Sequence, residues 1–138
     1  MIIVDSNILI DVLEKIEQEW RGWSIDRLVS LAAENRMVVN QIAFAEVAPR
    51  MGSIETFEEH LSAFEIEFEP ISSVGAFEAG TAFLAYKERR ETARLVLPDF
   101  FIGGHAFTAR ASILTRDPRF YRSYFPSVPL ITPDKADP

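Results

Sequence analysis

The sequence predicts an α/β fold in which a parallel sheet of four to five strands lies between helices. Three short, β-branched apolar runs, at 2–4, 38–39 and 113–114, are typical of strands buried on both faces. Two further strands carry edge features, since residues 66–70 alternate apolar and acidic side chains and residues 130–131 lie between prolines. With the apolar strands central, the predicted order is 3-2-1-4-5, numbered along the chain, with right-handed helical crossovers.

Polar capping residues and glycines mark where helices begin between these strands. Apolar residues recur at helical spacing after each of them. The predicted helices cover about 7–20, then Ser24 to Ala32 after a break at Gly22, a short stretch from Asn40 to Pro49, a stretch opening at Gly52-Ser53, Ser73 to about Arg90, and Asp99 to about Ala109.

Length and composition indicate one domain. A chain of 138 residues with 48% hydrophobic residues can bury a core, and we expect residues 1–138 to form a single unit. The chain has no cysteine, which excludes disulfides and thiolate chemistry. No apolar run approaches the roughly 18 residues of a membrane span. We therefore expect a cytoplasmic protein that does not associate with membranes.

The charge is unevenly distributed along the chain. A formal net charge of −7 argues against broad electrostatic binding to nucleic acid. Basic residues nevertheless gather between Lys87 and Arg122, which predicts a local basic surface. Solvated helix faces explain any single one of these charges equally well.

Four carboxylates occupy positions that a site at one edge of the sheet would use. Asp5 and Asp117 follow the two central strands that the predicted order places side by side. Asp99 comes directly after Pro98 at the start of a helix, and Glu46 lies in the helix after the second strand. Taken singly, the last three are equally explained as a turn residue, a helix cap and a solvent-facing residue. Asp5 is harder to explain structurally, because an unpaired carboxylate at the end of a buried strand costs desolvation free energy.

Together the four acids predict a site for a hard metal ion. Several converging carboxylates without cysteine or a well-placed histidine suit Mg²⁺ or Mn²⁺ better than Zn²⁺. Such a site can activate water and stabilise the leaving oxygen in phosphodiester cleavage. Ser6, Asn7 and Thr115 are the polar side chains expected to support it, by orienting Asp5 or holding a water. Arg116 is a candidate for a phosphate contact, although a surface position is slightly favoured for it.

Other polar residues and glycines are predicted to be structural. His105 is six residues after Asp99, so it does not share that helical face and is expected to be packed or hydrogen-bonded. Asp11 lies one turn beyond Asn7, and an exposed helix position is expected for it in preference to a role behind the first acid. The pair at 103–104 is expected to allow close packing of a helix on the sheet.

The motifs resemble those of the PIN-domain nucleases, and most closely those of the VapC-type toxins of prokaryotic toxin–antitoxin pairs. The resemblance rests on Asp5-Ser6-Asn7, Glu46, Pro98-Asp99 with the following Phe-Phe-Ile-Gly-Gly-His-Ala, and Thr115-Arg116-Asp117. It implies an α/β/α sandwich, a Mg²⁺- or Mn²⁺-dependent endoribonuclease, a homodimer, and a small antitoxin that inserts a segment into the acidic groove. The family usually has threonine after its first aspartate, and Ser6 keeps the hydroxyl.

By position, the resemblance assigns roles to individual residues. The metal-binding and catalytic acids would be Asp5, Glu46, Asp99 and Asp117, with Thr115 the nearby hydroxyl and Asn7 the support of the first acid. The RNA backbone would be held by basic residues, for which the candidates are Arg89, Arg90, Arg110 and Arg116. The expected products carry a 5′-phosphate and a 3′-hydroxyl, because metal-activated water and not the 2′-hydroxyl is the nucleophile.

Two other functional classes remain open. A phosphatase of the haloacid-dehalogenase type also begins with a strand ending in aspartate, but its chemistry needs a second acid two residues on, where this chain has Asn7. A PIN-like module that binds partners without catalysis, or that processes RNA outside a toxin pair, is the other alternative. Titration with Mn²⁺ distinguishes these classes, because a catalytic site should bind the metal and a binding module need not.

Overall fold

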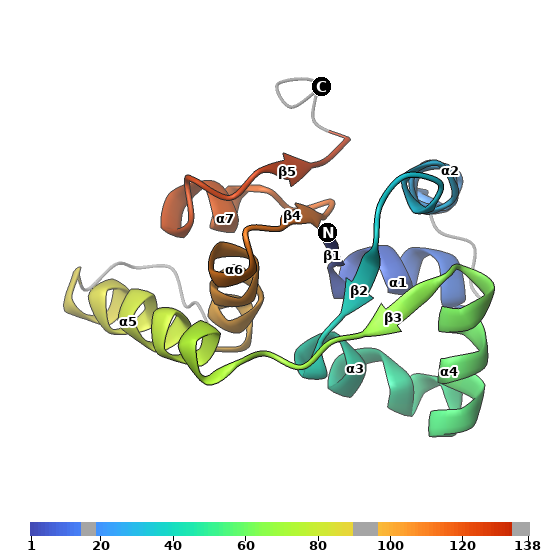
Figure 1. The fold of residues 1–138 in the computed structure, drawn as a ribbon, viewed down its shortest axis with the longest axis horizontal. Coiled ribbons are helices and arrows are strands. Elements are labelled where there is room, and N and C mark those ends of the chain that lie inside the picture. Colours follow the sequence, from blue (N-terminus) through green and yellow to red (C-terminus); the bar gives the residue numbers. More distant parts are fainter. Residues whose placement is uncertain (15–18, 90–96, 134–138) are drawn as a thin grey trace.

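One parallel sheet organises the computed structural model, which describes residues 1–14, 19–89 and 97–133 (Figure 1). Its strands are β1 (Ile2–Val4), β2 (Met37–Val39), β3 (Ile66–Phe68), β4 (Ser112–Leu114) and β5 (Leu130–Ile131). The order is β3-β2-β1-β4-β5, and every neighbouring pair is parallel. The predicted strand order is confirmed.

Helices cover both faces of this sheet, so the α/β/α sandwich is also confirmed (Figure 1). One face carries α1 (Ser6–Leu13), α2 (Arg21–Ala32), α3 (Gln41–Val47), the 3₁₀ turn η1 (Ala48–Met51) and α4 (Ile54–Ala63). The other carries α5 (Ser73–Arg89), α6 (Leu97–Ala109) and α7 (Arg119–Tyr124). Within the described ranges, none of the helices has both the length and the apolar content to cross a bilayer.

The central strand β1 shows how the sheet separates two hydrophobic cores. Ile2 and Val4 pack into the core on the side of α1–α4, whereas Ile3 packs into the core on the side of α5–α7. Successive side chains of a strand point to opposite faces, so a strand covered on both sides needs apolar residues throughout. The β-branched run at the start of the chain meets that requirement.

Two helix boundaries near the N-terminus differ from the prediction. Helix α1 ends at Leu13 and not near residue 20, because Glu14 is extended (φ −68°, ψ 142°). Helix α2 begins at Arg21, so Gly22 causes no break. Ser24 lies inside α2 and not at its cap, and its hydroxyl donates to a carboxylate of α1. Residues 15–18 of the predicted helix lie outside the described residues.

Helix α7 was not predicted. It is only six residues long, Arg119–Tyr124, and Pro118 occupies its N-cap position without a side-chain capping bond. A helix this short shows too little periodicity to be recognised, and it is held in place by packing. Tyr121 and the adjacent Phe125 belong to the core on the side of α5 and α6.

Small residues let α5 and α6 pack closely. A Cβ at Gly104 would lie 2.5 Å from the carbonyl oxygen of Gly75 and 2.8 Å from the backbone nitrogen of Ala79. A Cβ at Gly103 would lie 2.2 Å from the ring of Phe125. The two glycines therefore serve a helix–aromatic and a helix–helix contact, and the prediction that they allow close packing of their helix on the sheet is wrong.

Candidate functional site

The carboxyl ends of β1 and β4 bring Asp5 and Thr115 together. Each directly follows its strand, and the last strand residues, Val4 and Leu114, are paired in the sheet. The backbone N–H of Asp5 donates to the carbonyl of Leu114 at 3.0 Å. The hydroxyl of Thr115 donates to Asp5 Oδ2 at 2.9 Å. The side chain directly opposite Asp5 is therefore Thr115, with Asp117 two residues further on.

The Thr115 hydroxyl uses its full hydrogen-bonding capacity here. It accepts from Asn7 Nδ2 at 3.2 Å and from the backbone N–H of Asp117 at 3.0 Å. A hydroxyl has one proton and two acceptor sites, so with both acceptor sites filled its proton is directed at Asp5. Asn7 also accepts from the backbone N–H of Arg116 at 3.1 Å. Asn7 and Thr115 are thus hydrogen-bonded to each other. Thr115 also binds Asp5, and both residues bind backbone N–H groups of the turn after β4.

Asp5 caps α1 and is surrounded by donors. Its Oδ1 accepts from the backbone N–H of Ser6 at 2.8 Å, and its Oδ2 accepts from the hydroxyls of Thr115 and Tyr121, each at 2.9 Å. Burial nevertheless raises the pKa of Asp5 above its ordinary value of 3.8; these hydrogen bonds oppose the rise and the charge of Glu46 adds to it.

Tyr121 donates a hydrogen bond to Asp5, and this contact was not predicted from the sequence. Burial, and then the neighbouring charge of Asp5, raise the pKa of Tyr121 well above 10, so its phenol stays protonated and donates. The residue comes from α7, the unpredicted helix, and nothing in its sequence neighbourhood distinguishes it from a core tyrosine. Only the packing of α7 against the sheet brings its hydroxyl to the end of β1.

Glu46 and Asp99 reach the same region from other helices. Glu46 is exposed on α3, and Ser6 donates to its Oε1 at 2.7 Å. Asp99 is half-buried in the first turn of α6. The pKa of Asp99 is raised to about 6, chiefly by burial and then by the negative charges of Asp5, Glu46 and Asp117. The four predicted acids therefore lie close enough for their charges to act on one carboxylate.

The donor set matches a hard divalent cation in chemistry. All four acids offer oxygen, and the converging negative charge is what a cation would neutralise. As the side chains stand, the described residues contain no group of three or more histidine, aspartate or glutamate side chains spaced to hold an ion. Mg²⁺ commonly binds through one or two carboxylates and keeps several waters, so it does not need three direct ligands.

The basic residues that were candidates for RNA contacts are spread over the molecule. Arg116 lies in the turn after β4, and its Nε is 2.5 Å from Asp11 Oδ2. Arg89 places its guanidinium 5.8 Å from the ring centre of Tyr124. Arg110 follows α6 in a left-handed conformation (φ 55°), at the end opposite Asp99. Arg90 lies outside the described residues.

Two of the structural expectations have clear outcomes. His105 is buried, with Nδ1 3.0 Å from Asn40 Nδ2 and Nε2 3.1 Å from Glu69 Oε2, so the packed, hydrogen-bonded histidine is confirmed. Asn40 also caps α3, which carries Glu46, so this network joins α3 to α6. The exposed position expected for Asp11 is wrong: the residue is 1% exposed, because α2 and the turn after β4 cover it.

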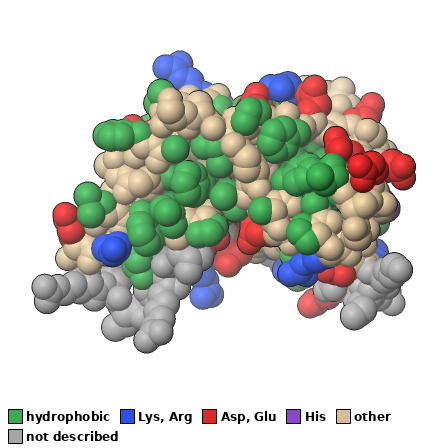
Figure 2. All heavy atoms as spheres, turned by 90° about the horizontal axis from the view of Figure 1, so that it is seen from below, with side chains coloured by type: hydrophobic (Ala, Val, Ile, Leu, Met, Phe, Trp, Pro, Cys, Tyr) green, Lys and Arg blue, Asp and Glu red, His purple; other side chains and the backbone are tan. Residues whose placement is uncertain are grey.

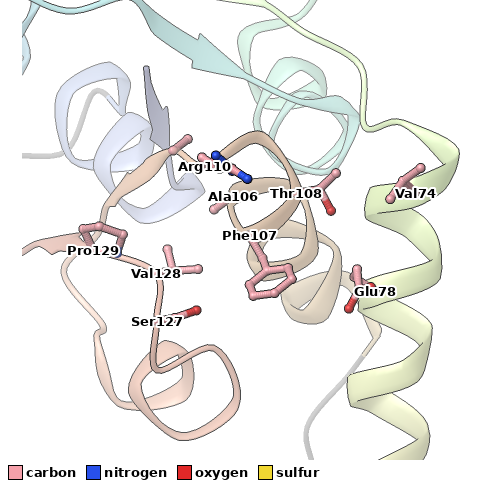
Figure 3. A pocket seen from close by; sticks show the side chains of 10 residues that line it. Val74, Glu78, Ala106, Phe107, Thr108, Arg110, Ser127, Val128 and Pro129 are labelled. Atoms are coloured by element: carbon pink, nitrogen blue, oxygen red, sulfur yellow. The ribbon is translucent and has the colours of Figure 1, made fainter.

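A cavity of about 600 Å³ lies away from the acids, at the end of α6 opposite Asp99 (Figure 3). Figure 3 shows Phe107 of α6 with Glu78 of α5 on one side and Ser127 and Val128 on the other. None of the four acids lines this cavity. Size alone therefore does not identify the functional site.

Comparisons with known proteins agree with this fold. The family model described as PIN domain matches residues 2–126. The structure of VapBC2 from Rickettsia felis bound to a DNA fragment from their promoter superposes with a TM-score of 0.75 at 21% identity, covering 96% of this chain and 98% of that chain. VapBC-1 from nontypeable Haemophilus influenzae gives a TM-score of 0.72 at 19% identity, with coverages of 96% and 98%.

A toxin–antitoxin complex from Klebsiella pneumoniae gives a TM-score of 0.68 at 21% identity, covering 97% of this chain and 98% of that chain. Among curated proteins, none matches this sequence. The structural neighbours show a shared fold over nearly the whole of both chains, and the family match covers the segments that carry all four acids.

Proposed function

The chain belongs to the PIN-domain family, and from that premise we propose that it is a metal-dependent endoribonuclease and the toxin of a type II toxin–antitoxin pair. One observation carries the nuclease proposal: the charges of Asp5, Glu46 and Asp117 all act on the half-buried Asp99. Four carboxylates from β1, α3, α6 and the turn after β4 have little reason to converge unless a cation joins them.

The four acids would hold Mg²⁺ or Mn²⁺. When bound, the ion would supply Lewis-acid activation of a water for in-line attack on an RNA phosphodiester and would stabilise the leaving oxygen. The hydroxyls of Thr115 and Tyr121 hold Asp5 Oδ2, which leaves its Oδ1 with the Ser6 N–H alone among the described contacts. The products would carry a 5′-phosphate and a 3′-hydroxyl.

The RNA backbone would be held by basic residues beside the acids. Arg116 directly precedes Asp117, and Arg89 lies against α7, the helix that also carries Tyr121. Arg89 is better placed than Arg110, which lies at the far end of α6, whereas the guanidinium of Arg116 is already paired with Asp11. Arg90 remains a candidate by its place in the sequence. An RNA substrate of this kind would put the protein in the cytoplasm.

A cognate antitoxin and a second copy of the chain are the proposed protein partners. The three structural neighbours described above are VapBC or toxin–antitoxin structures, and the acidic site would accept a basic side chain of an inserted segment. Hydrophobic side chains gather on one face of the molecule (Figure 2). On α5, Phe77 is 72% exposed, Leu84 59% and Val74 58%. An apolar face of this kind favours a protein–protein contact, which we assign to the homodimer.

Chelation tests the proposed function directly. The purified protein is expected to cleave RNA in Mg²⁺ or Mn²⁺ and to lose that activity in EDTA, with activity returning when the metal is restored, because the acids alone provide no Lewis acid. Gel analysis of a labelled RNA and chemical identification of its ends measure both the rate and the products. Undiminished cleavage in EDTA would rule the proposal out, and metal-independent binding of a partner without cleavage would favour the non-catalytic alternative.

Removing the Tyr121 hydroxyl is expected to weaken the site without unfolding it. In Tyr121→Phe the ring keeps its packing, but Asp5 loses one of the hydrogen bonds that oppose the rise of its pKa. We expect Mn²⁺ affinity and cleavage to fall by about 10-fold, at the lower end of the range for residues behind metal ligands. Calorimetric titration with Mn²⁺ measures the affinity. Tyr124→Phe, which alters a hydroxyl of the same helix, is the matched control and is expected to retain wild-type affinity.

A further inference from the structure

Behind the acids lies an ion pair between the buried Asp11 of α1 and the partly exposed Arg116 of the turn after β4. Asp11 is 1% exposed, and its Oδ2 lies 2.5 Å from Arg116 Nε and 2.8 Å from the hydroxyl of Ser24 on α2. A carboxylate withdrawn from water needs partners of this kind. The pair therefore joins α1, α2 and the turn at one point.

Helix α1 binds both the backbone and the side chain of Arg116. Asn7 lies one helical turn before Asp11, so both side chains project from the same face of α1. Asn7 accepts from the backbone N–H of Arg116 at 3.1 Å, while Asp11 binds the guanidinium of the same residue. Arg116 separates Thr115 from Asp117 in the chain, so fixing it by backbone and side chain fixes both neighbours.

The Thr115 hydroxyl has no capacity to adapt if this turn moves. Its two acceptor sites are filled by Asn7 and by the Asp117 N–H, and its proton is given to Asp5. A displacement of the turn would therefore break the bond to Asp5 or shift Asp117. Asp5 and Asp117 both belong to the proposed metal site. The ion pair between Asp11 and Arg116 can therefore affect the positions of these two ligands.

One carboxylate oxygen of Asp11 lacks a hydrogen-bond partner among the described residues. Its Oδ1 is buried with no hydrogen-bond partner among residues 1–14, 19–89 and 97–133. A buried charge with an unsatisfied oxygen is a poor way to gain stability, since apolar residues of similar volume commonly do as well or better. A role in placing the turn gives the pair a function that apolar packing would not supply.

We propose that Asp11 is a positioning residue that acts through Arg116 to set Thr115 and Asp117 in the four-acid site. The proposal rests on the proposed nuclease function for its catalytic consequence. It assigns the guanidinium of Arg116 to the contact with Asp11. A direct contact between Arg116 and an RNA phosphate is the competing assignment, and kinetics separate the two.

The test compares Asp11→Asn and Arg116→Lys with wild type. Asp11→Asn keeps the shape and the Ser24 bond but removes the charge that holds Arg116. Arg116→Lys keeps a cation beside Asp11, so the fold is preserved, but loses the fixed Nε donor. Both variants are expected to lose about 10- to 100-fold in Mn²⁺ affinity or kcat, with KM for RNA unchanged.

Glu14→Gln is the matched control. Glu14 follows α1, and its carboxylate pairs with Arg50 in a largely exposed ion pair at 2.8 Å, so this variant removes an ion pair from the same helix without touching the turn. Its Mn²⁺ affinity, kcat and KM are expected to match wild type. A raised KM with unchanged kcat in Asp11→Asn and Arg116→Lys would assign Arg116 to the RNA and overturn the proposal.

Amide hydrogen exchange gives a readout that does not depend on catalysis. The backbone N–H groups of Arg116 and Asp117 are both held by side chains, so Asp11→Asn is expected to accelerate their exchange in the metal-free protein, while Glu14→Gln leaves it unchanged. A wild-type protein that neither binds Mn²⁺ nor cleaves RNA would overturn the nuclease proposal, and the exchange rates would still test the positioning. Unchanged exchange at both amides would overturn the positioning itself.

Discussion

Replacing Asp5 with asparagine is expected to reduce RNA cleavage by about 1000-fold or more and to remove Mn²⁺ binding. A metal ion contributes several kcal/mol of transition-state stabilisation, and each 1.4 kcal/mol corresponds to about a factor of ten in rate. Asp5 lies at the end of β1, where Thr115 and Tyr121 orient it. Asparagine has the same size but no charge, so the ion loses an anionic ligand while the sheet is unaffected.

The side-chain amide of Asp5→Asn also cannot accept all the hydrogen bonds that the carboxylate of Asp5 accepts. Asp5 accepts on both oxygens, from the Ser6 N–H on one side and from two hydroxyls on the other. An amide presents NH₂ to one of those sides, so at least one donor loses its acceptor or must reorient. This limits how well the variant can imitate the native site even with the fold intact.

Cleavage of labelled RNA and calorimetric titration with Mn²⁺ measure the effect of Asp5→Asn, and circular dichroism checks the fold. Asp26→Asn, which changes an exposed acid of α2, is the matched control and is expected to behave as wild type. Full cleavage by folded Asp5→Asn would contradict the proposed role of this residue.

Replacing Asp99 with asparagine is expected to stabilise the metal-free protein at pH 7 while abolishing activity. The pKa of Asp99 is raised from 3.8 to about 6, first by burial and then by the charges of the other three acids. A rise of this size corresponds to about 3 kcal/mol for a fully buried group. Because Asp99 is about half-exposed, solvent screening reduces the expected gain to about 1–2 kcal/mol.

The sign of this effect depends on pH. A carboxyl group whose pKa is higher in the folded state contributes stability that is fully present below its unfolded value of 3.8 and is lost as the pH rises through about 6. Asp99→Asn removes that loss. The free energy of unfolding of the variant should therefore exceed that of wild type at pH 7 and equal it near pH 3.5.

Urea denaturation in EDTA across this pH range measures the difference. Adding Mn²⁺ should stabilise wild type through preferential binding to the folded state and should stabilise Asp99→Asn much less. If Asp99→Asn is less stable than wild type at pH 7 without metal, the ionised Asp99 does not destabilise the folded protein and the prediction is contradicted.

The strands were predictable because each is a short apolar run whose composition follows from burial on both faces. Ile2, Ile3 and Val4 alternate between two cores, and any polar residue there would be buried. Helix ends were less predictable. Ser24 has the chemistry of a cap, yet it lies inside α2, where its hydroxyl donates to the buried carboxylate of Asp11.

The predicted site residues divide in the same way. Asp5 and Thr115 directly follow paired central strands, so the strand order alone brings them together. Asp11 carried no such signal, because nothing local shows that α2 and the turn after β4 close over it. Tyr121 depended on α7, whose Phe120 packs against Phe100 of α6, and no local pattern in the sequence indicates that contact.

The parallel sheet, its strand order and the edge shared by the acids follow from the order of the residues, because burial on two faces and the carboxyl ends of adjacent strands leave few alternatives. Which polar groups meet at that edge depends on how the helices pack in three dimensions. The hydrogen bond from Tyr121 to Asp5 and the ion pair between Asp11 and Arg116 each join residues more than a hundred positions apart. Contacts of that kind depend on how α7 and α2 pack, and packing is a property of the whole fold and not of any segment.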